Sequence, residues 1–159
     1  MRFAVLTISD RCSQGLMQDT AGPSVVWLLG AHWTEAEIDT RILPDEEDQI
    51  AAALREYAAA GAALVLTVGG TGMSPRDRTP EATRSVIDRE APGLAEAIRS
   101  TGAQRNQFAW LSRGVAGLAG RTLIVNLPGS QRGAEESLAT ILGLLKHAVD
   151  VAAGGQTHP

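Results

Sequence analysis

Apolar stretches of strand length alternate with helical patterns along almost the whole chain, and this alternation limits the fold more than any other feature. Short apolar runs predict strands at residues 3–9, 37–43, 62–68 and 121–127. Helical patterns begin near residues 22, 44, 80, 92 and 130. Strand–helix alternation of this kind favours an α/β fold with three α/β/α layers and a mostly parallel central sheet.

Length and composition are compatible with one domain that covers residues 1–159. Only 4% of the residues are aromatic, so Ala, Leu, Val and Ile must fill the core. The net charge of −4 argues against nucleic-acid binding through a basic surface, and no apolar run reaches the roughly 20 residues of a membrane helix. Cys12 is the only cysteine, which excludes an internal disulfide. We therefore expect a cytoplasmic protein. Gly154-Gly155 should end the last helix and leave a loose tail at residues 156–159.

A glycine-rich turn, Gly69-Gly70-Thr71-Gly72, follows the third predicted strand directly. Three glycines in four residues allow backbone N–H groups to approach a ligand closely, and consecutive N–H groups suit phosphate. The turn is followed by Arg76 and Asp77, and then by Thr79-Pro80, which predicts a helix with Thr79 as its N-cap. A purely structural turn is the alternative, because the spacing fits neither a Walker A loop nor a dinucleotide fingerprint.

Two aspartates follow neighbouring strands at the same predicted edge of the sheet, Asp45 after the second strand and Asp77 after the third. A carboxylate repels phosphate unless a cation lies between them, and Mg²⁺ commonly uses one or two carboxylates together with substrate phosphates. The pair therefore predicts a site for Mg²⁺ and a nucleotide. N-capping of the following helix is the alternative for Asp45.

Four polar clusters fall at the same edge, beyond the carboxyl ends of the strands, where ligands bind in such sheets. They are Ser9-Asp10-Arg11, Pro44-Asp45-Glu46, Gly69-Gly70-Thr71-Gly72 and Pro128-Gly129-Ser130. Asp10-Arg11 follows the first strand, with a surface ion pair as the alternative. Ser112-Arg113 could reach an anionic ligand or form a polar turn, and Ser130 could bind an anion or cap the last helix. No nucleophile–base pair and no His–Cys metal spacing is present, which favours phosphoryl or nucleotidyl transfer over acyl transfer.

Several of these motifs occur together in a known order. They are Leu6-Thr7-Ile8-Ser9-Asp10-Arg11, Asp19-Thr20-Ala21-Gly22-Pro23, Leu43-Pro44-Asp45-Glu46, Gly69-Gly70-Thr71-Gly72, Arg76-Asp77-Arg78-Thr79-Pro80-Glu81-Ala82-Thr83, Arg89-Glu90-Ala91-Pro92-Gly93, Leu111-Ser112-Arg113 and Asn126-Leu127-Pro128-Gly129-Ser130. Over nearly its whole length the chain resembles the molybdenum-cofactor biosynthesis family of MogA, MoaB and the gephyrin G domain. Arg78 is a departure, because the family usually has Val at that position.

The resemblance implies a MogA/MoaB-like fold, usually a homotrimer, and adenylyl transfer from ATP to molybdopterin. It implies catalytic and metal-binding roles for Asp45 and Asp77. The implied nucleotide site comprises Gly69, Gly70, Thr71, Gly72, Ser74, Pro75, Pro128, Gly129 and Ser130. The implied molybdopterin site comprises Thr7, Ser9, Asp10, Ser112 and Arg113. A downstream molybdenum-insertion protein is the implied partner.

Two other functions remain compatible with the resemblance. One is a non-catalytic molybdopterin-binding or scaffold module, and the other is a nucleotide pyrophosphatase similar to CinA. CinA-like proteins usually carry a second domain, for which 159 residues leave no room. The sequence does not separate the MogA type from the MoaB type.

Overall fold

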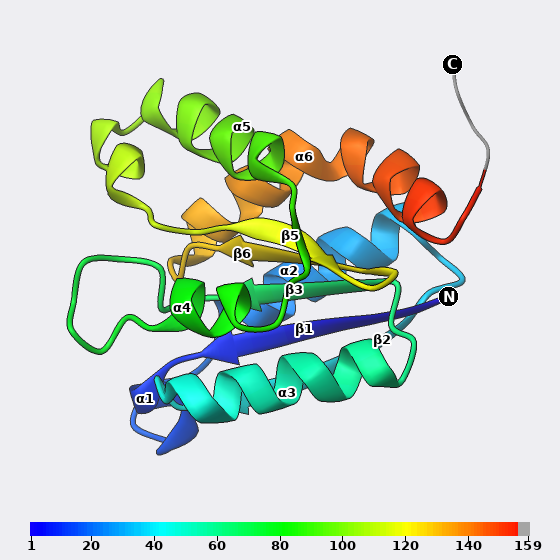
Figure 1. Cartoon of the computed structure of the whole chain (residues 1–159). Coiled ribbons are helices and arrows are strands. Elements are labelled where there is room, and N and C mark those ends of the chain that lie inside the picture. The colour runs from blue at the N-terminus through cyan, green and yellow to red at the C-terminus, as the bar shows by residue number, and fades with distance from the viewer. Residues whose placement is uncertain (156–159) are drawn as a thin grey trace.

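One six-stranded sheet forms the centre of the protein in the computed structural model, which describes residues 1–155 (Figure 1). The strands lie in the order β2-β1-β3-β6-β5-β4. Their bounds are β1 (Arg2–Ile8), β2 (Glu37–Leu43), β3 (Leu64–Val68), β4 (Arg89–Glu90), β5 (Ala116–Ala119) and β6 (Thr122–Leu127). Strands β2, β1, β3 and β6 are parallel, whereas β5 runs antiparallel to both β6 and β4.

Helices cover both faces of the sheet. One face packs on α2 (Ala21–His32), α5 (Pro92–Ala103) and α6 (Gln131–Ala152), and the other on α3 (Glu47–Ala59) and α4 (Thr79–Arg84). Two short helices, α1 (Asp10–Ser13) and the 3-10 helix η1 (Gln107–Leu111), complete the chain. The arrangement is the expected three-layer α/β/α fold with a mostly parallel sheet.

Alternating side chains on the central strands build the two cores. Phe3 and Val5 of β1 belong to the core under α2 and α6, whereas Ala4 and Leu6 of the same strand belong to the core under α3. A strand buried on both faces has no polar side, which explains why β1 and β3 read as continuous apolar runs rather than as alternating ones. β2 is largely exposed and lies at one end of the strand order, as expected of an amphipathic edge strand.

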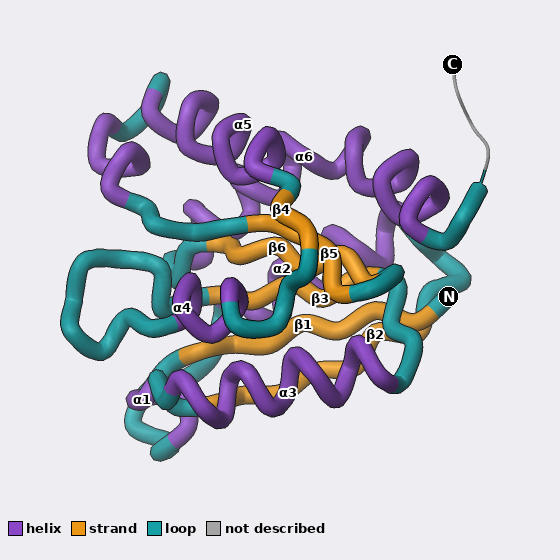
Figure 2. Tube along the Cα trace, in the orientation of Figure 1, coloured by secondary structure: helices purple, strands orange, loops and turns teal. Residues whose placement is uncertain are grey.

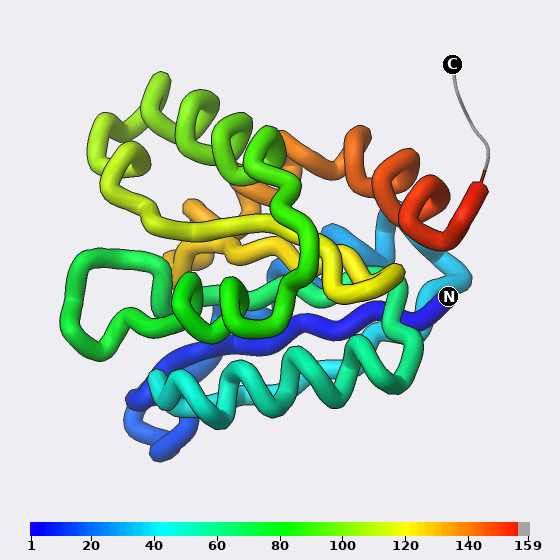
Figure 3. Tube along the Cα trace, viewed as in Figure 1, coloured from blue at the N-terminus to red at the C-terminus, as the bar shows by residue number. Residues whose placement is uncertain are grey.

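Because four strands are parallel, the carboxyl ends of β1, β2, β3 and β6 meet at one edge of the sheet, on the left of Figure 1. The N-terminus lies at the opposite edge (Figure 3). The long loop between β3 and α4 projects from the carboxyl edge (Figure 2). All four polar clusters predicted for this edge therefore follow the strands that end there.

Some local predictions were wrong. Thr79 is the first residue of α4 and Arg78 is its N-cap; the Thr79 hydroxyl donates to the Gly69 carbonyl oxygen at 2.9 Å instead of capping the helix. Helix α3 begins at Glu47 rather than at Pro44-Asp45, and Asp45 does not cap it. The sequence analysis also missed strand β5, which begins at Ala116 shortly after Gly114. Strand β4, helix α1 and the 3-10 helix η1 were missed as well.

Two remaining expectations concern the chain end and membranes. Helix α6 ends at Ala152, followed by Gly154 with a φ of 96°, in agreement with the predicted glycine stop. The predicted loose tail at residues 156–159 lies outside the described residues. Within residues 1–155, no helix combines the length and apolar character required to cross a membrane.

Candidate active site at the carboxyl edge of the sheet

An open cavity of about 720 Å³ lies beyond the carboxyl ends of β3 and β6. Its floor consists of two turns, the one after β3 and the one after β6, and its walls come from α5, η1 and the start of α6. Predicted site residues that line it are Gly70, Thr71, Gly72, Asp77, Ser112, Pro128, Gly129 and Ser130. The structure therefore brings the predicted nucleotide turn and the Pro128-Gly129-Ser130 turn to one cavity.

The two turns of the floor are in contact through their glycines. A Cβ atom placed on Gly129 would lie 3.2 Å from the Cα atom of Gly69, closer than ordinary van der Waals contact. A Cβ atom on Gly69 would overlap the Ile8 carbonyl oxygen. Gly69 and Gly70 also have φ values of 110° and 66°, a backbone region that disfavours other residues. Glycine is therefore required here by backbone conformation as well as by space.

The carbonyl oxygens of the glycine-rich turn are all bonded within the protein. Those of Gly69 and Gly70 accept from the Thr79 hydroxyl and the Thr79 N–H, at 2.9 and 3.1 Å. Those of Thr71 and Gly72 accept from the N–H and the Nε of Arg113, at 2.8 and 2.7 Å. Within residues 1–155, by contrast, no protein acceptor takes the N–H groups of residues 70–73. Unused N–H groups on a turn with satisfied carbonyls suit an anionic ligand.

Each of the two candidate metal-binding aspartates lies against one glycine of this turn. Asp45 Oδ1 would be 3.1 Å from a Cβ atom on Gly70, and Asp77 Oδ2 would be 2.8 Å from one on Gly72. Asp77 Oδ2 also accepts the N–H of Ser74 at 2.9 Å. The two carboxylates therefore flank the turn, although only Asp77 lines the cavity.

The charge around Asp45 favours a cation. Burial raises the pKa of the Asp45 carboxyl above its ordinary value, and the nearby carboxylates of Asp10 and Asp77 raise it further. Within the described residues no three His, Cys, Asp or Glu side chains converge as a ready metal site. The donor set therefore fits Mg²⁺ only in the form typical of that ion, with one or two carboxylates completed by ligand oxygens and water.

Arg76 is bound to carboxylates rather than left to face the cavity. Its Nε and Nη2 each donate to Asp10 at 3.0 Å, and Nη2 also donates to Glu46 at 2.9 Å. The hydrogen bond from Arg76 is the main reason that the pKa of Asp10 lies below its ordinary value. The ion-pair alternative for Asp10 is thus present, with Arg76 as the partner rather than Arg11.

Most of the residues predicted to hold molybdopterin lie outside this cavity. The Thr7 hydroxyl donates to Asp19 at 2.6 Å, and Ser9 caps α1 by accepting from the Cys12 N–H at 3.2 Å. Arg113 lines a second cavity of about 370 Å³ on the other side of Ser112. Of the predicted molybdopterin set, Ser112 alone lines the main cavity, and it also lines the second one.

The contacts of Ser130 and Arg78 show what these two residues do in the fold. Ser130 caps α6, because its hydroxyl accepts from the Gly133 N–H at 3.1 Å, and it lines the cavity as well. Arg78, the departure from the family pattern, donates twice to Glu47 Oε2, at 2.9 and 2.7 Å. Its charge is therefore paired on the α3 side of the loop.

The sequence analysis missed the outer wall of the cavity. This wall is built by Thr101, Gly102, Arg105, Asn106, Phe108 and Ala109. Phe108 is 67% exposed. The only local signal was Asn106, whose side chain caps η1 by accepting from the Phe108 N–H at 3.1 Å.

Comparisons with known proteins agree with this geometry. The family model described as "Probable molybdopterin binding domain" matches residues 4–147. The molybdopterin adenylyltransferase of Escherichia coli K12 is 41% identical over 87% of this chain and 72% of its own length. A crystal structure of MoaB from Thermus thermophilus has a TM-score of 0.89 at 47% identity and covers 96% of both chains.

A longer relative is similar over the same range. The molybdenum cofactor synthesis protein cinnamon of Drosophila melanogaster is 44% identical over 98% of this chain, but the match covers only 27% of that protein. The chain thus spans about a quarter of the length of this relative. The remainder of that protein lies outside the match.

Proposed function

Because the chain belongs to the family of probable molybdopterin binding domains, we propose that it is a molybdopterin adenylyltransferase that acts in molybdenum cofactor biosynthesis. The observation that carries this proposal is the turn at residues 69–72, whose carbonyl oxygens are bonded and whose N–H groups after Gly69 are unused beside the cavity. Relatives at about 40% identity that carry the name molybdopterin adenylyltransferase favour this activity over a purely structural role.

In the proposed reaction a phosphate oxygen of molybdopterin forms a bond to the α-phosphorus of ATP. The bond to the β-phosphate breaks, and pyrophosphate leaves with the electron pair. A phosphate monoester is largely anionic at neutral pH, so the protein needs no general base. This agrees with the sequence, which predicts no nucleophile–base pair.

The protein would act mainly by positioning and by charge. The unused N–H groups of residues 70–73 would hold phosphate oxygens of ATP, and Pro128, Gly129 and Ser130 would form the adjoining floor. Asp45 and Asp77 would hold Mg²⁺, which when bound neutralises the charge of the triphosphate. Ser112 would face the molybdopterin phosphate, and the predicted roles of Thr7, Ser9 and Asp10 stay predictions.

Wider features of the proposal rest on the family alone. We propose one molybdopterin-binding domain over residues 1–159, a homotrimer, a cytoplasmic location and a molybdenum-insertion protein as the recipient of the product. The bifunctional relative from Synechococcus elongatus, 36% identical over 94% of this chain and 47% of its own length, supports a functional link to a second activity. Sedimentation of the purified chain would measure the proposed trimer.

Incubation of the purified protein with molybdopterin and α-labelled ATP tests the activity. We expect adenylylated molybdopterin and pyrophosphate in equal amounts, and loss of both when a chelator removes divalent ions. Molybdopterin binding without product would instead indicate a non-catalytic binding module. Hydrolysis of the nucleotide without molybdopterin would indicate a pyrophosphatase similar to CinA. Full turnover in excess chelator would contradict the proposed Mg²⁺ role of Asp45 and Asp77.

A further inference from the structure

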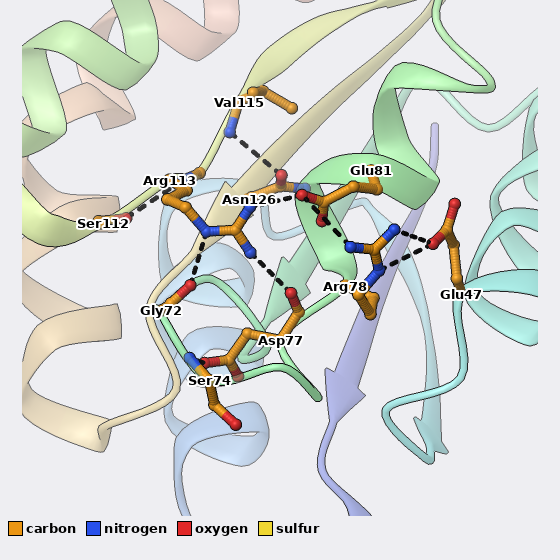
Figure 4. A network of polar contacts seen from close by, with 11 residues as sticks. Glu47, Gly72, Ser74, Asp77, Arg78, Glu81, Ser112, Arg113, Val115 and Asn126 are labelled. Atoms are coloured by element: carbon orange, nitrogen blue, oxygen red, sulfur yellow. Dashed lines mark hydrogen bonds and ion pairs between the residues drawn. The ribbon is translucent and has the colours of Figure 1, made fainter.

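Arg113 donates from its main-chain N–H and from each guanidinium nitrogen to the segment between β3 and α4 and to the first turn of α4 (Figure 4). Its main-chain N–H donates to the Thr71 carbonyl oxygen at 2.8 Å. In the side chain, Nε donates to the Gly72 carbonyl oxygen at 2.7 Å and Nη2 to the Asp77 carbonyl oxygen at 2.6 Å. The remaining nitrogen, Nη1, donates to Glu81 Oε1.

These bonds close a loop. One planar guanidinium holds the carbonyl groups of Gly72 and Asp77, and the residues between them, 73–76, are all exposed. Inside the loop the Asp77 N–H donates to the Ser74 carbonyl oxygen and the Ser74 N–H donates to Asp77 Oδ2, both at 2.9 Å. The Asp77 carboxylate thus sits on a short ring whose two ends are fixed by the same side chain.

We propose that Arg113 and Glu81 are positioning residues, which set the place of the Asp77 carboxylate and of the N–H groups of the turn beside it. This inference rests on the proposed function of the site. It differs from the role that the family resemblance implies for Arg113, because no nitrogen of its guanidinium is without a protein acceptor.

The geometry requires a guanidinium. Arginine presents five donors in a rigid plane, so one side chain can hold two carbonyl groups and a carboxylate at the same time. A lysine ammonium keeps the charge but has no fixed fork, and it cannot reproduce all three directions. The side chain is also 30% exposed, so it lies within the wall of the site rather than in the deep core.

Glu81 fixes the orientation of the guanidinium through one of its two carboxylate oxygens. Burial favours the neutral form of its carboxyl, but the Arg113 hydrogen bond and the charges of Arg113 and Arg78 outweigh burial, and the pKa lies below its ordinary value. Its second oxygen, Oε2, is buried and has no hydrogen-bond partner within the described residues. An unpaired buried oxygen of this kind calls for an explanation beyond the stability of the fold, which argues for a role of Glu81 in the site.

The test compares Glu81→Gln, Arg113→Lys and the double variant with the parent protein. Binding of Mn²⁺ in the presence of ATP is measured by electron paramagnetic resonance, and binding of molybdopterin by calorimetry. We expect each single variant to weaken Mn²⁺ binding about 10-fold or more, as loss of a supporting contact does at metal sites. We expect the double variant to bind Mn²⁺ no more weakly than the single variant with the lower affinity, because both substitutions disrupt the same contact. Molybdopterin affinity should stay unchanged.

A matched pair elsewhere on the molecule supplies the control. Arg41 and Glu56 form a two-pronged ion pair at 2.8 and 2.6 Å between β2 and α3. Arg41→Lys and Glu56→Gln make the same chemical changes and should leave Mn²⁺ and molybdopterin binding unaltered. If these control variants weaken Mn²⁺ binding as much as the Arg113 and Glu81 variants do, a loss of structural order throughout the protein explains the effect and the proposal is wrong.

Two other results would overturn the proposal. Weaker molybdopterin binding in Arg113→Lys but not in Glu81→Gln would make Arg113 a ligand of the pterin. A lower melting temperature with unchanged Mn²⁺ binding would make the contact merely structural. If the parent forms no adenylylated product while both variants still weaken Mn²⁺–ATP binding, the positioning role stands and the proposed activity fails.

Discussion

Asp10 and Asp45 hold each other by a reciprocal pair of hydrogen bonds. The main-chain N–H of each donates to the carboxylate of the other, and both distances are 2.9 Å. The pair ties the segment after β1 to the segment after β2, and it fixes Asp45 without using its Oδ1 atom in the contact. The Oδ1 atom of Asp45 has no hydrogen-bond partner within the described residues, which supports the proposed role of Asp45 as a metal ligand.

Removal of either candidate metal-binding charge should abolish most of the proposed activity. Asp45→Asn and Asp77→Asn keep the size of the side chain but weaken the hold on Mg²⁺, so we expect the rate of pyrophosphate release to fall about 100-fold or more. Molybdopterin binding, measured by calorimetry, should be retained. Asp39→Asn, which breaks the exposed ion pair with Arg2, is the control and should turn over normally. Parent-like rates in both site variants would place the metal elsewhere.

Asp45→Asn should make the protein more stable at neutral pH. The pKa of Asp45 is raised in the folded state, so the ionised carboxyl destabilises the fold once the pH exceeds its ordinary value of 3.8. We expect a gain in melting temperature at pH 7 on the order of 1–3 °C, which shrinks as the pH falls through the raised pKa and is absent below 3.8. A gain that is independent of pH would contradict this origin.

Asp10→Asn should make the protein less stable at neutral pH, because the pKa of Asp10 is shifted in the opposite direction to that of Asp45. The hydrogen bond from Arg76 lowers the pKa of Asp10, so its ionised form stabilises the fold above the ordinary pKa and this stability is lost as the pH falls through the lowered value. We therefore expect a lower melting temperature at pH 7 and a smaller difference in strong acid. Thermal melts of the two variants across the same pH series decide both predictions.

Gly70→Ala should impair nucleotide binding beyond the effect of backbone strain. The new Cβ would overlap the Thr79 hydroxyl and lie 3.1 Å from Asp45 Oδ1. Gly61→Ala provides a matched control, because Gly61 has a φ of 76° and nothing within 4 Å of its added Cβ. Both should lose about 1–2 kcal/mol from strain, but only Gly70→Ala should weaken ATP binding, by about 10-fold or more if one phosphate contact is lost. Equal ATP affinities in the two variants would make the turn structural only.

Asn126 should be a major contributor to stability. Its Oδ1 accepts the Val115 N–H at 3.1 Å, and its Nδ2 donates to the hydroxyls of Thr67 and Thr83, both at 2.9 Å, in the buried region between β6 and α4. Asn126→Ala leaves buried polar groups unpaired, and we expect a loss of about 3–5 kcal/mol in urea unfolding. Asn106→Ala, which removes only the cap of η1, should cost about 1 kcal/mol.

Sequence patterns were sufficient to predict the layers of the fold and the edge that carries the site. Four apolar runs correspond to β1, β2, β3 and β6, and their parallel pairing places Asp45, Asp77 and the glycine-rich turn at one end. Strand β5 was missed because Ala116–Ala119 contains a glycine and two alanines, which carry little strand signal of their own. Its place is set by pairing with β6, a tertiary effect.

The partners of the charged side chains could not be read from the sequence. Arg76 meets Asp10 across 66 positions of the chain, and Arg113 meets Gly72 across 41. Both arginines lie in a polar motif that suits an anionic ligand equally well. Only the folded arrangement separates an arginine that binds carboxylates and carbonyl groups from one that is available to phosphate.

The contact between Gly69 and Gly129 limits how the pocket can be altered by mutation. Neither glycine can gain a side chain without pushing the two turns apart, so these two positions cannot be used to engineer a new ligand preference. The opposite wall, built on η1 and the end of α5, has side chains such as Phe108 that face open space and tolerate exchange. Directed evolution toward other nucleotides should accumulate its substitutions there and leave both glycines unchanged.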